Sequence, residues 1–463
     1  MQGVKNSKHI LAAGFIVLML LTLLLVAMPS REGKMIAAYL WPVAVALFIM
    51  MAIAHVNRPT PTGIVGLLMA CWFIACTLMN GDHFLEFNLR FVYGAVLTFG
   101  VGLPLFQTLD GQAKDRWLMG IMVAFGTVAA FVGLISTYAC LRDRLIALPG
   151  MEGTIGITMY RLYAFGRHPN EVGCMLNIGL LCWLTLLFRV RSAWVKMLCV
   201  LVLAPICFAL SLTVSRTAIA IASLALGGSC LVAVTKKKGW LRWIVGSGLM
   251  AAVCAVALYG MMTFIPQLLP SGATDVVIYQ EHIEAGMYTQ EELDAIQADS
   301  EERDGHIWQR DLTDGLGTFS MRTEIWQSGI AYIQQNPRTL LLGNTDGQVA
   351  RIPYRALDRE IYHMHNTYLE ILLLAGIPGL ILYGFVLICF LWQAAKLFFS
   401  SDTPAWQRVL AATPVALLPC TLMEIYPSVS GRASDMMMLA LIGAVIDYGR
   451  GLGKRNTSEQ TLG

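Results

Sequence analysis

Long apolar runs separated by short polar connections follow one another along almost the whole chain. A run of about 18 or more apolar residues is long enough to cross a bilayer as a helix. Twelve segments fit this pattern, at residues 10–28, 35–55, 62–79, 91–108, 117–139, 171–188, 197–213, 217–235, 240–265, 366–392, 407–424 and 433–448. The pattern therefore predicts an all-α polytopic membrane protein with about 12 transmembrane helices.

The composition supports this class. Only 14% of the residues are charged, against about a quarter in soluble globular proteins, and 56% are hydrophobic, with a mean hydropathy of +0.62. An ordinary soluble protein is excluded. The formal net charge of +3 gives no reason to expect a nucleic-acid partner, because the informative quantity is which loops hold the charge.

The first thirty residues resemble a signal peptide, with Lys5 and Lys8 ahead of an apolar stretch. That stretch is long for a signal peptide, and a second apolar run follows almost at once. We therefore expect an uncleaved first transmembrane helix.

Cysteine usage points away from a disulfide framework. Ten of the eleven cysteines lie inside apolar runs, Cys140 lies near a polar edge, and the longest polar loop contains none. This distribution predicts small, buried and reduced thiols. No CxxC pair or histidine-rich cluster has metal-ligand spacing, so neither a metal site nor a cofactor is expected.

Lysine and arginine are concentrated in alternate connections, and cytoplasmic loops of membrane proteins carry the excess of these residues. This bias predicts that both termini are cytoplasmic and that loops 140–170 and 266–365 are extracytoplasmic. The chain then divides into transmembrane helices 1–9 over residues 1–265, the long loop 266–365, and transmembrane helices 10–12 with a cytoplasmic tail over residues 366–463.

The long outer loop has two parts. Residues 281–304 are rich in aspartate and glutamate, and a solvated insertion is favoured over a binding surface. After them, Trp326, Ile330 and Ile333 follow at i, i+4 and i+7, with Ile325 beside them, which predicts an amphipathic helix lying on the bundle or on the membrane surface.

Two arginines are candidates for binding an anion. Arg216 lies at a tight outer junction between two apolar runs, where a charge is expensive unless it reaches the interface or a partner. A guanidinium binds phosphate through two parallel hydrogen bonds, although an arginine extending to lipid headgroups would look the same. Arg322 lies at the start of the predicted amphipathic helix, ahead of Trp326, and is equally compatible with an ordinary surface arginine.

Residues 161–173 add Arg161, Arg167, His168 and Asn170 just before an apolar run. Asn170 is a candidate N-cap of that helix. The density of donors predicts a polar wall around an outer cavity.

The segment His365 to Glu370 begins another apolar run. Thr367 and Glu370 fit a capping box, which leaves His365 unexplained. A histidine just outside a helix N-terminus faces free N–H groups and the positive end of the dipole, an environment that keeps the ring neutral and able to act as a base. The same N-terminus attracts phosphate, although a structural histidine is the alternative.

The spacing favours a functional histidine. His365 and Asn366, then nine residues, then Gly376 and Gly379 form the pattern H-[N/S/Q]-x9-G-x-x-G. With the twelve spans, the long outer loop before the motif and the Ser-Arg-Thr-Ala segment around Arg216, the chain resembles the bacterial O-antigen ligase and polymerase superfamily, integral-membrane transferases of polyprenyl-linked glycans.

This resemblance implies transfer of a glycan from an undecaprenyl diphosphate carrier to a hydroxyl of lipid A-core, at the outer face of the bacterial inner membrane, without metal or other cofactor. His365 matches the proposed base, and Arg216 and Arg322 match the arginines that hold the donor diphosphate. Further cavity candidates are Arg161, Arg167, His168, Asn170 and Asn366. Gly376 and Gly379 are expected to shape the helix, with a kink at Pro378.

Other functions remain open at this stage. A polymerase would use a second lipid-linked repeat as the acceptor, and a third kind of family member would glycosylate a secreted protein. A polysaccharide transporter would need no base and often shows paired halves, which this chain lacks, and a scaffold would leave Arg216 and His365 without a role. The sugar, the acceptor and the oligomeric state leave no residue signature.

Overall fold

The computed structural model of the protein describes residues 2–26, 39–56, 59–80, 92–142, 146–147, 154–158, 161–164, 169–235, 239–265, 314–344, 352–354, 359–361, 364–400, 402–423 and 432–460. The acidic stretch 281–304 lies outside the described residues.

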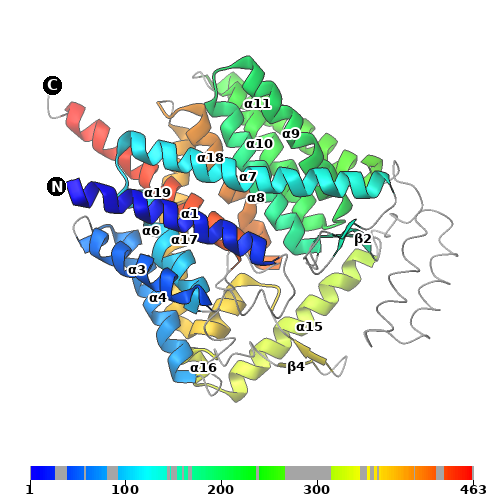
Figure 1. Ribbon diagram of the computed structural model, residues 1–463. Helices are drawn as coiled ribbons and strands as arrows, with labels where there is room; N and C mark the ends of the chain where they lie inside the picture. Colours follow the sequence, from blue (N-terminus) through cyan, green and yellow to red (C-terminus); the bar gives the residue numbers. More distant parts are fainter. Residues whose placement is uncertain are drawn as a thin grey trace.

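The described part of the chain is a bundle of long helices (Figure 1). The first half contains α1 (Gln2–Val26), α3 (Trp41–Val56), α4 (Pro61–Asn80), the π-helix η1 (Val96–Gly102) that continues as α6 (Leu103–Thr108), and α7 (Gly111–Leu141). Next come α8 (Pro169–Arg189), α9 (Ala193–Leu212), α10 (Arg216–Val234), α11 (Trp240–Tyr259) and η2 (Gly260–Phe264). The last third holds α15 (Asp314–Gln335), α16 (Thr339–Leu342), α17 (Thr367–Phe399), α18 (Ala405–Met423) and α19 (Ala433–Gln460).

The all-α prediction is confirmed, because each of the twelve predicted apolar segments overlaps a helix. Seven of the described helices are long and apolar enough to cross a membrane, namely α4, α7, α8, α9, α10, α11 with η2, and α17. The number of twelve spans stays a prediction. The cysteines whose side chains are described are all free, and Cys140 is buried.

Helix α19 lies in the interior of the bundle. Nearly every residue from Met436 to Ile446 is buried, as expected of a helix that is apolar on all sides and surrounded by other helices. Helix α11 is the opposite case, since Gly246 is its one buried residue and its large apolar side chains are exposed. In a membrane this exposed face would contact lipid.

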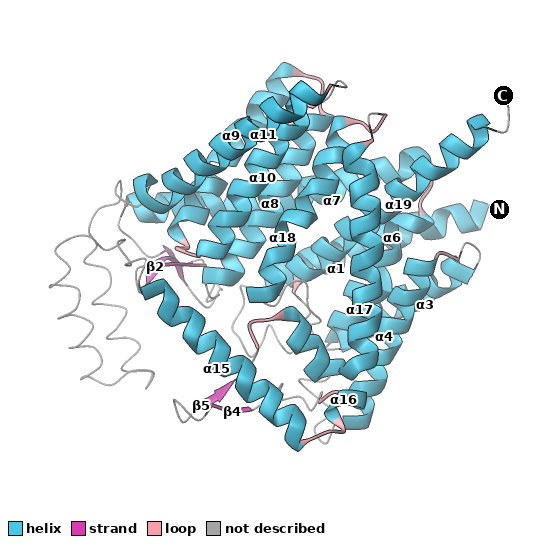
Figure 2. Cartoon of the chain, turned by 180° about the vertical axis from the view of Figure 1, so that it is seen from behind, coloured by secondary structure: helices cyan, strands magenta, loops and turns pink. Residues whose placement is uncertain are grey.

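Two small sheets lie near α15, on the side of the bundle away from both chain ends (Figures 1 and 2). Strands β1 (Ile146–Ala147), β2 (Thr154–Thr158) and β3 (Arg161–Tyr163) form an antiparallel sheet in that order. Strands β4 (Ile352–Tyr354) and β5 (Arg359–Ile361) form an antiparallel hairpin. The strands belong to the two loops predicted to be external, so the described parts of these loops lie on the same side of the bundle.

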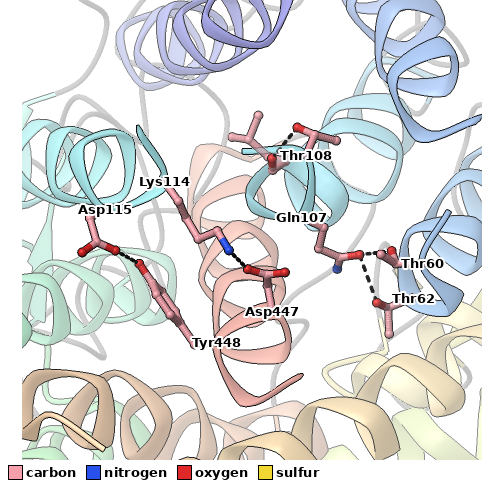
Figure 3. Close-up of polar contacts among 9 residues, drawn as sticks. Thr60, Thr62, Gln107, Thr108, Lys114, Asp115, Asp447 and Tyr448 are labelled. Atoms are coloured by element: carbon pink, nitrogen blue, oxygen red, sulfur yellow. Dashed lines mark hydrogen bonds and ion pairs between the residues drawn. The ribbon is translucent and has the colours of Figure 1, made fainter. Parts of the chain in front are cut away.

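Polar contacts hold the other end of the bundle together (Figure 3). Lys114 of α7 pairs with Asp447 of α19, and Tyr448 donates a hydrogen bond to Asp115. Near them, Gln107 accepts hydrogen bonds from Thr60 and Thr62. These groups are paired with one another, so they tie α7 to α19 and α6 to the start of α4.

Helix α15 is amphipathic, but its buried stripe differs from the predicted one. Ile333 is buried as expected, whereas Ile330 is 45% exposed. Gly329 takes the inward position, where an added Cβ would lie 2.6 Å from the sulfur of Met364. The buried side of α15 packs on α17 through a small core of Ile333, Met364 and Leu373 with Ile325, Tyr332, Leu340, Leu369 and Leu372 around it.

Helix α17 is kinked at Gly376 and not at Pro378. Gly376 has φ 65° and ψ −169°, a backbone conformation that favours glycine, and an added Cβ would lie 2.6 Å from the carbonyl oxygen of Leu341. The kink exposes carbonyl groups of α17, and other elements bond them. The N–H of Asn344 donates to Leu373, and Nε1 of Trp72 donates to Ala375 at 2.7 Å.

Candidate active site

The N-terminus of α17 is capped by Asn366. Its Oδ1 accepts hydrogen bonds from the N–H groups of Tyr368 and Leu369 at 3.0 and 3.1 Å, and its Nδ2 donates to the carbonyl of Leu422 in α18 at 3.2 Å. The predicted capping box of Thr367 and Glu370 is therefore wrong, because Asn366 already bonds the free N–H groups of the first turn. Asn366 anchors the start of α17 to α18.

Glu370 has a different partner from the one a capping box requires. Its Oε2 accepts a hydrogen bond from the backbone N–H of Met364 at 2.9 Å, and the residue is only 6% exposed. From the other side, Nε1 of Trp326 in α15 donates to the carbonyl of Met364 at 2.9 Å. Both backbone polar groups of Met364 are thus bonded, directly before His365.

His365 has a left-handed backbone, with φ 46°. Val214, with φ 48°, is the only other non-glycine residue of the described chain with positive φ. Such conformations are uncommon, especially for a β-branched residue. They cost of order 1–3 kcal/mol and gather where a structure holds a side chain for a purpose. One outlier is the predicted base, and the other lies two residues before Arg216.

Arg216 is the first residue of α10, directly after the N-cap Ser215. The turn before it is built from hydroxyl contacts, since Oγ1 of Thr213 accepts from the N–H of Ser215 at 3.2 Å. Helix α8 packs on this turn: Nδ2 of Asn177 donates to the carbonyl of Ala218 at 3.0 Å. These contacts hold the start of α10, where Arg216 is half-buried, against α8.

A charged group connects α8 with α17. Arg432, just before α19, forms an ion pair with Glu171 in the first turn of α8. Arg432 and His365 both lie close enough to Glu370 to act electrostatically on its carboxyl group. Because α8 also packs on the turn of Arg216, these contacts bring Arg216 and His365 to the same end of the bundle.

Arg322 reaches this end on α15. The helix begins at Asp314, so Arg322 lies within it and not at its start as predicted. It precedes Trp326 by four residues and therefore lies on the same face of the helix. Since Trp326 bonds the residue before His365, the half-buried Arg322 is one helical turn from that contact.

The structure describes only some of the remaining cavity candidates. Arg161 belongs to β3, where it pairs with Thr158. Arg167 and His168 lie outside the described residues. Asn170 is the second residue of α8, so it is not the N-cap that was predicted; it is half-buried and adjoins Glu171.

Sequence reasoning missed Glu171, Glu370 and Arg432 as members of the site. Glu370 was considered only as part of a cap. The available signal was that Glu171 and Arg432 are opposite charges at the outer edges of two apolar runs. The assembled groups can bind an anion through guanidinium groups and accept a proton at an imidazole. Within the described ranges, no group of three or more His, Cys, Asp or Glu residues could hold a metal ion.

Comparison with known proteins agrees with this reading. Residues 200–384 match the family model described as O-antigen ligase, and this segment contains Arg216, Arg322 and His365. No curated protein matches the chain. The match over residues 200–384 supports the resemblance of the chain to the O-antigen ligase and polymerase superfamily.

Proposed function

We propose that the protein is a glycan ligase of the inner membrane. It moves a glycan from undecaprenyl diphosphate to a hydroxyl of a lipid A-core acceptor at the outer face of that membrane. One observation carries the proposal: among the described residues of the matched segment, the two non-glycine residues with left-handed backbone are His365 and Val214, two residues before Arg216. The family match alone does not explain why these two positions have a left-handed backbone.

Arg216 and Arg322 bind the donor diphosphate in this proposal. A guanidinium pairs with phosphate oxygens through two hydrogen bonds. Arg216 is the first residue of α10, so free backbone N–H groups and the positive end of the helix dipole support the same anion. Arg322 adds a second guanidinium from α15. Stabilising charge that develops on a leaving group is often the largest catalytic contribution.

His365 is the general base. The acceptor oxygen attacks the anomeric carbon while its proton passes to the imidazole. The bond from that carbon to the diphosphate oxygen breaks, and the diphosphate leaves with the electron pair. A single displacement inverts the anomeric centre. General-base assistance is worth about 10²–10⁴-fold in rate. The diphosphate is already a stable anion, so it needs no proton.

The proposal includes metal independence, because two guanidinium groups supply the charge that a divalent cation would otherwise bring to the diphosphate. Treating the purified enzyme with EDTA should therefore leave the transfer rate unchanged. A rate that falls in EDTA and returns with Mg²⁺ would contradict this part of the proposal.

The test supplies purified protein with a defined undecaprenyl diphosphate glycan and two acceptors, a core lipid and a second copy of the lipid-linked glycan. We expect product on the core lipid. Arg216→Ala should weaken transfer by at least about tenfold, since it removes a bidentate contact to phosphate. Arg116→Ala is the matched control, because Arg116 lies near the start of α7, where it donates a hydrogen bond to Gln112 of the same helix at 3.5 Å.

The two acceptors separate the two activities of the superfamily. A ladder of lengthening lipid-linked products, with no product on the core lipid, would make the protein a polymerase that uses the same site. Absence of both products, or full activity in Arg216→Ala, would reject the proposed donor site.

A further inference from the structure

Glu370 is a buried carboxylate that the start of α17 does not require. Asn366 already bonds the N–H groups of Tyr368 and Leu369, and the N–H of Glu370 itself donates to the carbonyl of Asn366 at 2.9 Å. The helix is therefore capped without the side chain of Glu370. Burial of an acidic side chain that is 6% exposed in a membrane-spanning helix costs free energy. This cost indicates that Glu370 has a role other than capping.

The carboxylate points back to the residue before His365. Oε2 of Glu370 accepts a hydrogen bond from the N–H of Met364. This bond fixes the orientation of the peptide group on the N-terminal side of Met364. Trp326 fixes the following peptide plane through the carbonyl of Met364. A positive φ at a histidine persists only where the surroundings determine it, and these two hydrogen bonds supply that determination.

We propose that Glu370 is a positioning residue for His365, acting through its hydrogen bond to the Met364 peptide. This inference rests on the proposed function, in which His365 is the base. The acceptor proton ends on the imidazole, and Glu370 takes no part in the proton transfer. It does not touch the donor diphosphate, which Arg216 and Arg322 hold.

The experiment compares Glu370→Leu with Glu370→Gln in the full-length enzyme with the defined donor and acceptor. Leucine fills the space but offers no acceptor for the Met364 N–H. We expect kcat to fall about 10²-fold, the scale on which small displacements of a reacting group act, while KM for the donor stays within about threefold. Glutamine keeps an acceptor oxygen for the Met364 N–H, so it should restore kcat to within about threefold of wild type.

The controls separate positioning from loss of stability. Trp72→Phe removes a hydrogen bond of similar length to the same helix, from Trp72 to Ala375, without touching Met364. It should lower thermal stability and leave kcat within about twofold. A kcat of Glu370→Leu within twofold of wild type would overturn the inference. A fall in kcat together with a rise in donor KM for Glu370→Leu, with no recovery in Glu370→Gln, would also overturn the inference.

Two further variants decide the cases that Glu370→Leu alone leaves open. If Glu370→Leu does not fold, Glu370→Ala decides: it also removes the acceptor, so we expect kcat about 10²-fold below wild type with donor KM within about threefold, and a kcat within about twofold of wild type rejects the inference. His365→Ala runs in parallel. Full activity of His365→Ala would reject the proposed base itself, whereas an inactive His365→Ala with a fully active Glu370→Leu would reject only the positioning role.

Discussion

At the scale of single residues, the candidate site is marked by backbone conformation. His365 and Val214 have left-handed backbones, and neighbouring side chains hold both positions: Glu370 and Trp326 bond Met364 beside the first, and Thr213 bonds Ser215 beside the second. Strain of this kind is maintained only against a cost in stability. The two strained positions are His365 itself and the residue two before Arg216, and our proposal assigns the roles of base and diphosphate ligand to these two side chains.

This strain gives a prediction about stability. Glycine adopts positive φ without penalty, whereas alanine does not. Replacing His365 by glycine should therefore give a protein more stable than His365→Ala by about 1 kcal/mol, although neither variant has an imidazole. Thermal unfolding of both variants in the same detergent measures the difference. Equal melting temperatures, or a more stable alanine variant, would show that His365 is not held under strain.

The cap of α17 gives a second residue-scale prediction. Asn366→Ala removes the bonds to the N–H groups of Tyr368 and Leu369 and the tether to α18. Loss of an N-cap lowers stability by about 1 kcal/mol. Thr367→Ala is the matched control, because Thr367 was the cap that the sequence suggested. If Thr367→Ala is destabilised more than Asn366→Ala, the cap has been assigned to the wrong residue.

At the scale of elements, the kink in α17 fixes how the helix meets α16. Gly376 lies against the carbonyl groups at the end of α16, and Asn344 and Trp72 bond the carbonyls that the kink releases. The same region of α17 packs on α15, which carries Arg322 and Trp326. The glycine motif therefore shapes the helix and its neighbours, while the histidine at the helix start is placed by separate contacts.

Gly376→Ala tests this element directly. A Cβ there would require φ 65° of a non-glycine residue and would lie 2.6 Å from the carbonyl oxygen of Leu341, so we expect a loss of about 2 kcal/mol or more in stability. Gly384→Ala in the same helix is the control, because nothing lies within 4 Å of its added Cβ. Similar melting temperatures for the two variants would contradict the described kink.

The sequence was sufficient for the helices and insufficient for the contacts between them. Apolar length alone predicts a spanning helix such as α17, and the family pattern selects His365. The kink was assigned to Pro378 because proline is the stronger local signal, whereas close approach of α16 decides in favour of Gly376. Glu171 and Arg432 are 261 positions apart, so only the packing of α8 beside the start of α19 could reveal their ion pair.

At the scale of the whole molecule, the bundle separates two polar regions. One end holds the contacts of α7 with α19 near the chain termini, where Lys114 and Asp447 are paired. The other end holds α15 and the small sheets (Figure 2). Arg322 lies on α15, and Trp326 of the same helix bonds the residue before His365. An amphipathic helix over a polar site at one end of an apolar bundle suits a donor with a lipid tail in the membrane and a glycan outside it.

The most direct test of the central claim is the rate of glycan transfer from undecaprenyl diphosphate by His365→Ala, with His9→Ala as the matched histidine control. His9 lies near the other end of the bundle, where its ring accepts a hydrogen bond from Trp117. We predict that His365→Ala still binds the donor but transfers glycan at least about 10²-fold more slowly, and that His9→Ala is close to wild type. Transfer by His365→Ala at the wild-type rate would contradict the account.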